Sequence, residues 1–475
     1  MVENEKTVQL AVVGAGPGGY AAAFMAADLG LQVALIGEEE NPGGVCLYRG
    51  CIPSKALLHV AQVIAESRRA AHWGIEFSEP RIDIDKLRSW KEDVVRKLTG
   101  GLGLLAKQRA VRYIHGRASF SDRRVLRIRK HDGGEEDLHF EKAILATGSR
   151  PSRLPGIVLE SPRVLDSTSA LELKGVPETM LVVGGGYIGL ELGTVYASLG
   201  TKVALIEMTD GLLPGVDRDL VSILAKRLEH LFDSIMLNTK VTGLKEEAGG
   251  IRARLLGAEG RDLEQLYEAV LVSVGRKPNS EIDGLEKTGV EMDARGFIKI
   301  NAQRRTADPD IYAIGDVAGE PMLAHKATHE GRVAAEAISG RKVAFEPQAI
   351  PAVVFTDPEV AWCGLTETKA RETNRSIKVV RFPWGASGRA LTLDRTDGST
   401  KLILDPESGQ ILGAGIVGAG AGELIAEGVL AVEMGALASD VMWSTHPHPT
   451  LSETIMEAAE SFYGQSTHVY RPKRG

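Results

Sequence analysis

Short runs of apolar residues, ending in glycine or another small residue, alternate with longer helical segments along most of the chain. The run at 8–13 ends in Gly14, and the run at 142–145 ends in the small residues 146–149. Alternation of this kind predicts an α/β fold with parallel strands. The expected elements are strands at 8–13, 32–36 and 142–145, helices at 20–29, 55–69 and 84–107, and a β-meander at 111–140 that turns at 132–134.

The same pattern begins again near residue 180, with a strand at 180–183, a helix up to 199 and a strand at 201–206. A G-x-G-x-x-G motif follows the first strand of each unit. Its glycines recur 170 positions apart, as Gly14, Gly16 and Gly19 and then as Gly184, Gly186 and Gly189. Between a strand and a helix, such glycines let the backbone approach a pyrophosphate at the helix N-terminus. The sequence therefore predicts two dinucleotide-binding units.

Breaks in composition divide the chain into four expected domains. Pro151 and Pro155 mark a linker after the first unit, and an apolar strand ending at Arg276 closes the second. A later strand at 310–316 ends in Asp316, at the strand end where open α/β sheets bind ligands, although a turn role for this Asp is the alternative. We expect two Rossmann-like units and a C-terminal α+β domain that carries a subunit interface. The boundaries are 1–150 and 151–278 for the two units, 279–348 for a central domain and 349–475 for the interface domain.

The composition excludes several classes of protein. The chain has 475 residues, of which 43% are hydrophobic and 25% charged, as is ordinary for a soluble multidomain protein. A net charge of −7 without a dense basic patch argues against nucleic acid as the main partner. Apolar runs are too short to span a bilayer, and the polar segment 1–7 leads straight into a strand, so we expect no membrane span, no signal peptide and a cytoplasmic location.

Two of the three cysteines, Cys46 and Cys51, lie four residues apart after the first nucleotide motif. A disulfide across so short a loop needs Cα atoms about 5.5 Å apart, so the backbone must turn tightly. We expect Gly50 to allow this turn through a positive φ. Two buried thiols or half of a metal site are the alternatives, but an intracellular pair favours redox catalysis. The third, Cys363, has no local partner and is expected to be buried.

The two nucleotide units differ where an acid normally accepts hydrogen bonds from the adenosine ribose. The second unit has Glu207 at this position, and the first has Gly37. In the first unit Glu38 is the candidate acid, with a solvated turn at 38–40 as the alternative. No basic residue follows Glu207 in the segment 208–210, so a 2′-phosphate would be repelled and NAD is favoured over NADP.

Two apolar helical segments each carry a single formal charge. Lys55 is the only charge in 52–64, and Glu191 is the only charge in 187–199. Because burying an unpaired ion costs several kcal/mol, we expect these two residues to pair near the cysteine loop. The alternative is that each side chain reaches water by itself.

A second cluster of reactive groups lies near the C-terminus. Two prolines hold His446 and His448 at a rigid corner before a helix. His448 can take a proton from a thiol while Glu453 orients its ring, whereas His446 is expected to be structural. A helix-capping role for Glu453, in the pattern Thr450-x-x-Glu453, is the alternative.

With these residues in place, the chain resembles the FAD-dependent pyridine nucleotide-disulfide oxidoreductases of the dihydrolipoamide dehydrogenase type over essentially its full length. The resemblance rests above all on Cys-x4-Cys-Ile-Pro-Ser-Lys at 46–55 and His-x-His-Pro-Thr-Leu-Ser-Glu at 446–453. It implies FAD in the first unit, NAD in the second and no metal. Cys46 would attack lipoyl sulfur and Cys51 would contact the flavin, while His448 and Glu453 would reach the cysteines of the other subunit of a homodimer.

The resemblance also implies cofactor contacts at matching positions. For FAD these are the first fingerprint and Glu38, Lys55, Ala118, Thr147, Gly148, Ser149, Asp316, Met322, Leu323, Ala324 and His325. For NAD they are the second fingerprint and Ile188, Glu191, Glu207, Val241 and Gly275.

Three features depart from the family pattern. Gly37 replaces the usual acid, Pro447 replaces a small residue, and Tyr48-Arg49 replaces Asn and a small hydrophobe, which suggests altered access to the disulfide. The implied partner is a lipoyl-carrying protein, namely a 2-oxoacid dehydrogenase complex, a glycine-cleavage H protein or a stand-alone carrier. Alternatives are a related reductase with another disulfide substrate, or a flavin-bearing assembly subunit without turnover.

Overall fold

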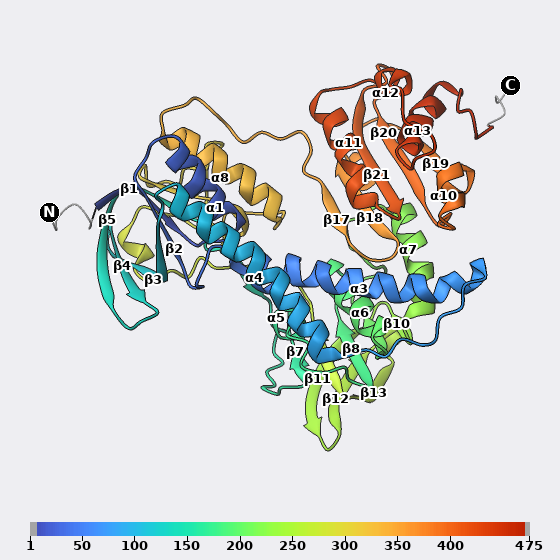
Figure 1. Ribbon diagram of the computed structural model, residues 1–475, viewed down its shortest axis with the longest axis horizontal. Coiled ribbons are helices and arrows are strands. Elements are labelled where there is room, and N and C mark those ends of the chain that lie inside the picture. Colours follow the sequence, from blue (N-terminus) through green and yellow to red (C-terminus); the bar gives the residue numbers. More distant parts are fainter. Residues whose placement is uncertain (1–6, 471–475) are drawn as a thin grey trace.

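The computed structural model describes residues 7–470, which form three large β-sheets with helices packed around them (Figure 1). Segment 1–7, on which the expectation about a signal peptide rests, lies outside the described residues except for Thr7. The first sheet lies at the left of the view, the second at the lower centre and the third, C-terminal sheet at the upper right (Figure 1).

The first sheet combines parallel strands with an antiparallel meander. Its order is β1-β2-β3-β4-β5-β16, and β1 also pairs with β5. The strands are β1 (Thr7–Val13), β2 (Val33–Gly37), β3 (Arg112–Asp122), β4 (Val125–Lys130), β5 (Glu135–Leu145) and β16 (Ile311–Ala313). The expected meander is confirmed, and β16, shorter than the predicted 310–316, extends the sheet of the N-terminal unit from far along the sequence.

Small residues bring two helices close together over this sheet. Helix α1 (Pro17–Asp28) buries Ala22, Ala23 and Ala26 and packs against α8 (Ala324–Ile338). A side chain at Gly331 of α8 would lie 2.5 Å from the Gly18 carbonyl oxygen, so only glycine permits this approach. Close helix packing thereby fixes the first glycine motif against the segment that follows Asp316.

The second sheet repeats the parallel arrangement of the first. Its order is β10-β9-β8-β14-β7, and every pairing is parallel. The strands are β7 (Val164–Leu165), β8 (Thr179–Val183), β9 (Lys202–Ile206), β10 (Ser234–Met236) and β14 (Ala269–Val272), with helices α5 (Ser167–Leu171), α6 (Tyr187–Ser198) and α7 (Arg218–Leu231). Its meander forms a separate sheet of β11 (Lys240–Glu247), β12 (Gly250–Leu256) and β13 (Asp262–Tyr267).

The C-terminal sheet is antiparallel, in the order β17-β18-β21-β20-β19. Its strands are β17 (Ala352–Val354), β18 (Glu359–Gly364), β19 (Lys378–Pro383), β20 (Ser399–Leu404) and β21 (Ile411–Gly418), and its helices are α9 (Glu367–Glu372), α10 (Gly388–Thr392), α11 (Ala421–Glu433), α12 (Ala438–Trp443) and α13 (Glu453–Tyr463). Cys363 is buried in this core, as expected, and burial raises the pKa of its thiol to about 12. The α/β fold class with an α+β C-terminal domain is confirmed.

Several elements join the three sheets. Helices α3 (Cys51–Arg69) and α4 (Ile84–Gln108) extend from the first sheet across the second (Figure 1). The expected linker at Pro151 is instead part of β6 (Ser149–Pro151), which pairs with β15 (Arg276–Pro278). Between the second and third sheets, the buried Lys401 ammonium lies 2.6, 2.8 and 2.9 Å from the carboxylates of Asp217, Asp219 and Glu367. The three carboxylates of this cluster therefore bind the ammonium group of Lys401.

Candidate active site

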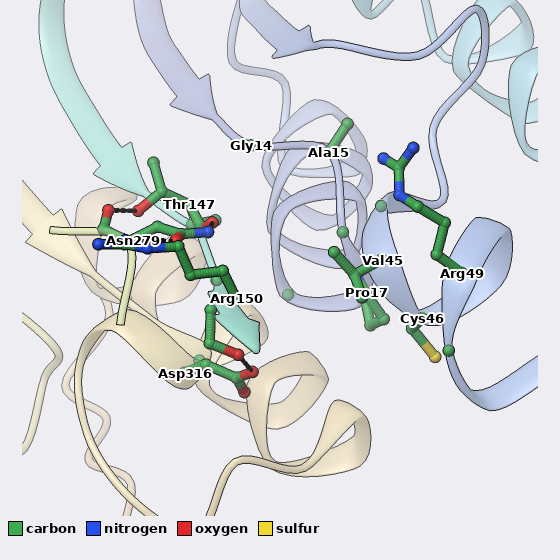
Figure 2. A pocket seen from close by; sticks show the side chains of 18 of the residues that line it. Gly14, Ala15, Pro17, Val45, Cys46, Arg49, Thr147, Arg150, Asn279 and Asp316 are labelled. Atoms are coloured by element: carbon green, nitrogen blue, oxygen red, sulfur yellow. Dashed lines mark hydrogen bonds between the residues drawn. The ribbon is translucent and has the colours of Figure 1, made fainter. Parts of the chain in front are cut away.

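A cavity of about 720 Å³ lies where the first nucleotide unit meets the second. It has the volume of a site for a large organic ligand. Many residues that the sequence predicts for cofactor binding line it, namely Gly14, Gly16, Glu38, Lys55, Ala118, Thr147, Gly148, Ser149, Asp316, Met322 and Ala324, with Ile188 and Glu191 from the second unit. Figure 2 shows the glycine loop and Cys46 on one side and Thr147, Arg150 and Asp316 on the other.

The first glycine motif forms a cradle beside this cavity. Gly14 has φ +104°, and a side chain there would lie 2.2 Å from the Ala146 carbonyl oxygen. A side chain at Gly19 would lie 1.8 Å from the Gly14 carbonyl oxygen, so Gly19 packs the helix on the strand and does not line the cavity. Gly16, at the start of α1, has open space above its Cα. The loop therefore offers backbone N–H groups of a helix N-terminus to a pyrophosphate.

The second motif repeats this geometry. Gly184 has φ +109°, a side chain at Gly189 would lie 2.2 Å from the Gly184 carbonyl oxygen, and Gly186 again has open space. The carboxylate of Glu207 accepts hydrogen bonds from the Gly185 N–H at 2.7 Å and the Thr209 N–H at 2.8 Å. Of the residues predicted to bind NAD, Gly184, Gly186, Gly189, Glu207, Val241 and Gly275 lie outside the cavity that holds the cysteines.

The two cysteines occupy neighbouring helices. Cys46 lies in the short helix α2 (Gly44–Arg49), Cys51 begins α3, and both free thiols line the cavity. The predicted positive φ at Gly50 is wrong, because its φ is −144°. A side chain at Gly50 would lie 3.0 Å from the Val45 carbonyl oxygen, so a larger residue would require a small local shift. The positive φ belongs to Gly44, at +58°.

The thiols differ in acidity because they share a hydrogen bond. The hydrogen bond from Cys46 lowers the pKa of Cys51 to about 7, against the opposing effect of burial, and the positive charge of Lys55 lowers it further. The same hydrogen bond to Cys51, with burial, raises the pKa of Cys46. The pair thus holds one proton tightly and releases the other near neutrality.

The predicted pairing of Lys55 with Glu191 is confirmed. The Lys55 ammonium lies 2.8 Å from the Glu191 carboxylate, which is almost fully buried and also accepts hydrogen bonds from the Ser54 hydroxyl at 3.1 Å and the Phe355 N–H at 3.0 Å. This pair joins α3 of the first unit to α6 of the second at the edge of the cavity.

Two side chains that line the cavity, those of Arg276 and Asn279, were missed by sequence reasoning, although their partners were predicted. Asp316 accepts a hydrogen bond from the Ser149 hydroxyl at 2.5 Å, and Arg276 holds Ser149 through its hydroxyl and its carbonyl, both at 2.7 Å. Thr147 and Asn279 exchange two hydrogen bonds, at 2.8 and 2.9 Å (Figure 2). Their sequence separation of more than a hundred residues left no local signal. Leu323 and His325 are not among the residues that line the cavity, and the His325 ring contacts the Pro351 carbonyl oxygen at 2.7 Å.

The C-terminal histidines have different surroundings. His446 is nearly buried, with its ring nitrogens 2.8 Å from Glu427 and from the Ser444 carbonyl oxygen, as expected of a structural residue. His448 is 74% exposed, and its Nδ1 lies 2.9 Å from the Glu453 carboxylate. Glu453 also accepts the Thr450 N–H at 2.7 Å, which is one half of a capping box. The other half is absent, because Ser452 is the N-cap residue of α13 and no side chain caps the helix. Partial burial raises the pKa of Glu453, but the hydrogen bonds from Thr450 and His448 outweigh it and lower this pKa. His448 does not line the cavity that contains the two cysteines.

Tyr48 and Arg49, for which the sequence suggests an effect on access to the disulfide, both bind the loop that follows Gly37, and Arg49 also lines the cavity that contains the cysteines. The Tyr48 hydroxyl donates to the Asn41 carbonyl at 3.1 Å, and Arg49 forms an ion pair with Glu39. Both side chains therefore turn back onto the loop that follows Gly37.

Comparison with known proteins assigns this arrangement. The model of the pyridine nucleotide-disulphide oxidoreductases matches residues 8–331, and the model of their dimerisation domain matches residues 350–459. The chain belongs to this family. A similar relative is a dihydrolipoyl dehydrogenase of Haemophilus influenzae, 49% identical over 99% of this chain and 98% of its own length. Another, from Thermus scotoductus, is 45% identical over 98% and 99%.

Solved structures show the same architecture. LpdA from Mycobacterium tuberculosis has a TM-score of 0.88 at 25% identity and covers 96% of this chain and 99% of its own. The HOCl-induced flavoprotein disulfide reductase RclA from Escherichia coli has a TM-score of 0.84 at 27% identity, over 95% and 99% of the chains.

Family membership makes the chain a flavoprotein disulfide oxidoreductase with FAD and NAD as cofactors, as the sequence predicts. The glycine cradle with open space at Gly16 fits the FAD pyrophosphate. The dimerisation domain at 350–459 supports the expected homodimer. Within residues 7–470, none of the helices combines the length and apolar character needed to cross a bilayer.

Proposed function

We propose that the protein oxidises the dihydrolipoamide group of a lipoyl-carrying protein and passes the two electrons to NAD⁺. The observation that carries this proposal is the position of Cys46 and Cys51 in the cavity between the two nucleotide units, beside the Lys55–Glu191 pair. Relatives named dihydrolipoyl dehydrogenase that cover nearly the whole chain support it. They also make another disulfide substrate, or a subunit without turnover, the weaker alternative.

In the proposed reaction the resting enzyme has a Cys46–Cys51 disulfide. A dihydrolipoamide thiolate attacks the Cys46 sulfur, which forms a mixed disulfide and releases Cys51 as a thiolate. The second lipoyl thiol attacks the first lipoyl sulfur, which closes the lipoamide disulfide and releases Cys46. FAD, when held in the cavity that Cys51 lines, would provide the redox chemistry that carries two electrons from the dithiol to NAD⁺. The positive charge of Lys55 lowers the pKa of Cys51 and so favours its departure as a thiolate, because a more acidic thiol leaves faster.

A base must remove protons from dihydrolipoamide, and we propose His448 for this role, oriented by Glu453. Its ring is exposed and does not line the cavity of its own chain. In a homodimer it would therefore serve the cysteines of the other subunit. Cys46 would be the thiol that exchanges with the lipoyl group, and Cys51 the thiol next to the flavin.

The remaining assignments extend this proposal. We propose that the residues predicted to contact FAD and NAD do so. We also propose four domains, which end at residues 150, 278, 348 and 475. The electron acceptor is proposed to be NAD rather than NADP, because Glu207 lies at the ribose position. The lipoyl carrier itself, and a cytoplasmic location, are part of the proposal.

Steady-state assays with free dihydrolipoamide and with lipoylated carriers of each kind, using NAD⁺ and NADP⁺ in parallel, test this function. We expect NADH formation with dihydrolipoamide and a higher kcat/KM with one carrier than with the others. Glutathione in its oxidised form, assayed with NADPH, serves as the rival substrate. Turnover of glutathione but not of dihydrolipoamide would contradict the proposal.

A further inference from the structure

The loop at 38–41, next to the missing acid, is held by two side chains of strand β3. Tyr113 and His115 are two residues apart and so lie on one face of the strand. The Tyr113 hydroxyl donates to the Glu39 carbonyl at 2.6 Å, and the His115 Nε2 lies 3.1 Å from the Glu38 carbonyl oxygen. Two successive backbone carbonyls of the loop are thus fixed from the sheet.

Helix α2 holds the same loop from the other side. Arg49 forms an ion pair with the Glu39 carboxylate. The Tyr48 hydroxyl donates to the Asn41 carbonyl at 3.1 Å and accepts from the Asn41 N–H at 3.3 Å. Tyr48 and Arg49, which depart from the family pattern, therefore contact the loop that follows Gly37, another departure from that pattern.

Tyr113 occupies the space that a side chain at position 37 would need. A Cβ atom at Gly37 would lie 2.6 Å from the Tyr113 hydroxyl oxygen. Burial is the main cause that raises the pKa of Tyr113, so the phenol keeps its proton and its hydroxyl donates a hydrogen bond to the Glu39 backbone carbonyl. A hydroxyl that donates its only hydrogen still has lone pairs with which to accept a hydrogen bond.

The cavity surface at this place is made by Gly37, Glu38 and Tyr113. The Glu38 carboxylate is exposed and makes no hydrogen bond or ion pair with any other residue in the part of the chain that the structure describes. Two residues with hydrogen-bond acceptors, the charged Glu38 and the neutral Tyr113, therefore line the cavity next to the position that an acid usually occupies.

We propose that the Tyr113 hydroxyl and the Glu38 carboxylate bind the adenosine ribose hydroxyls of FAD in place of an acid at position 37. Each acceptor takes a hydrogen bond from the ribose, and the contacts of Arg49, Tyr48 and His115 hold the loop in position. The inference rests on FAD in the first unit and is independent of which disulfide the enzyme oxidises.

Binding of FAD and of an analogue with 2′,3′-dideoxyadenosine to the deflavinated protein tests this proposal, with quenching of flavin fluorescence as the readout. We expect wild-type protein to prefer FAD by about tenfold or more, because hydrogen bonds to a charged group are the stronger ones. In Glu38→Gln and Tyr113→Phe, FAD binding weakens toward that of the analogue, while analogue binding stays as in wild type. Phenylalanine keeps the ring that fills the space above Gly37.

The neighbouring acid Glu40 provides the matched control, since it is exposed and does not line the cavity. Glu40→Gln should keep the full preference for FAD. An unchanged preference in both Glu38→Gln and Tyr113→Phe would overturn the proposal, as would an equal loss of affinity for FAD and for the analogue, which marks a purely structural effect. Because these measurements follow FAD binding alone, a failure to oxidise dihydrolipoamide would be recognised separately.

Discussion

The two nucleotide-binding units share a backbone arrangement but differ at two matching positions. The second unit has Gly185 and Glu207 where the first has Ala15 and Gly37. In the second unit, Gly185 leaves room for Glu207, whose Cβ would lie 3.1 Å from a Cβ added at Gly185. In the first unit Ala15 stands where Gly185 does, and a Cβ at Gly37 would lie 2.7 Å from that of Ala15. The first unit can therefore lack an acid at the end of β2 only if other groups, here on β3 and the following loop, accept the hydrogen bonds in its place.

The units also diverge just after this point. The Gly43 N–H donates to the Ala15 carbonyl at 2.8 Å, and the Leu213 N–H donates to the Gly185 carbonyl at 2.9 Å, so both loops return to the same position. The first chain segment then enters α2 with Cys46, whereas the second leads into α7. One frame thus supports disulfide chemistry in the first unit and nucleotide binding without a reactive thiol in the second.

If the proton transfer by His448 serves only the reaction of the cysteines, its loss should slow the half-reaction with dihydrolipoamide and not the half-reaction with NADH. We expect His448→Gln to lower dihydrolipoamide oxidation by about 100-fold to 10,000-fold, the usual contribution of a general base. Reduction of the bound flavin by NADH should stay near the wild-type rate, since it needs no base for a thiol. Stopped-flow absorbance measures both half-reactions. Equal slowing of the two would contradict this division.

His446→Gln is the matched control for that substitution. Its ring is nearly buried against Glu427 and carries no proposed chemistry. We expect a loss of stability with little change in the rate of either half-reaction per bound flavin.

The ion pair that joins the units should contribute to stability. Lys55→Met leaves the buried Glu191 carboxylate without its cation, and we expect the free energy of unfolding to fall by about 2 kcal/mol. This is less than for a fully buried pair, because the Lys55 side chain is 32% exposed. Urea denaturation of the holoenzyme measures the change. Lys86→Met, which breaks an exposed pair with Asp83, should leave the free energy of unfolding nearly unchanged, and a similar loss in both variants would refute the assignment.

The acid of the second unit should decide between the two pyridine nucleotides. Glu207→Ala removes an acceptor for the ribose and a charge that repels a 2′-phosphate. We expect the preference for NAD⁺ over NADP⁺, measured as the ratio of kcat/KM values, to fall about tenfold. Asp210→Ala, at a nearby exposed acid, should leave the ratio unchanged. A constant ratio in Glu207→Ala would show that the units do not differ in this way.

The smallest predicted effect is a shift in the pH dependence of Cys51 alkylation. An acid with a lowered pKa is ionised above that pKa, so alkylation of Cys51 in the reduced protein should reach half its maximum near pH 7. Lys55→Met removes a positive charge that lowers this pKa, and the profile should move to higher pH. Iodoacetamide labelling with peptide mass spectrometry follows Cys51 separately from Cys46. A profile that does not move would exclude the role of Lys55.

Features encoded by local spacing could be predicted from the sequence. The two glycine motifs, the cysteine loop and the histidine–glutamate contact each lie within a few residues, and Lys55 and Glu191 stood out as single charges in apolar helices. Contacts between distant segments could not. Nothing near Ser149 indicates Arg276, and nothing near Gly37 indicates Tyr113, because only the pairing of β15 with β6 and of β3 with β2 brings them together.

The conformation of Gly50 and the direction of Tyr48 and Arg49 were also beyond local reasoning. A tight turn indicates glycine, but not whether the reason is a positive φ or the closeness of the Val45 carbonyl oxygen. Tyr48 and Arg49 suggested altered access to the disulfide. Their partners, Asn41 and Glu39, could not be predicted, because they lie in a loop that only the folded chain places beside them.

Anaerobic bleaching of the yellow flavin in Cys46→Ser tests the central claim most directly, because it addresses the two units separately. We predict that dihydrolipoamide bleaches the wild-type flavin rapidly and leaves that of Cys46→Ser oxidised, whereas NADH bleaches both. Rapid bleaching of Cys46→Ser by dihydrolipoamide would contradict entry of electrons through the Cys46–Cys51 pair.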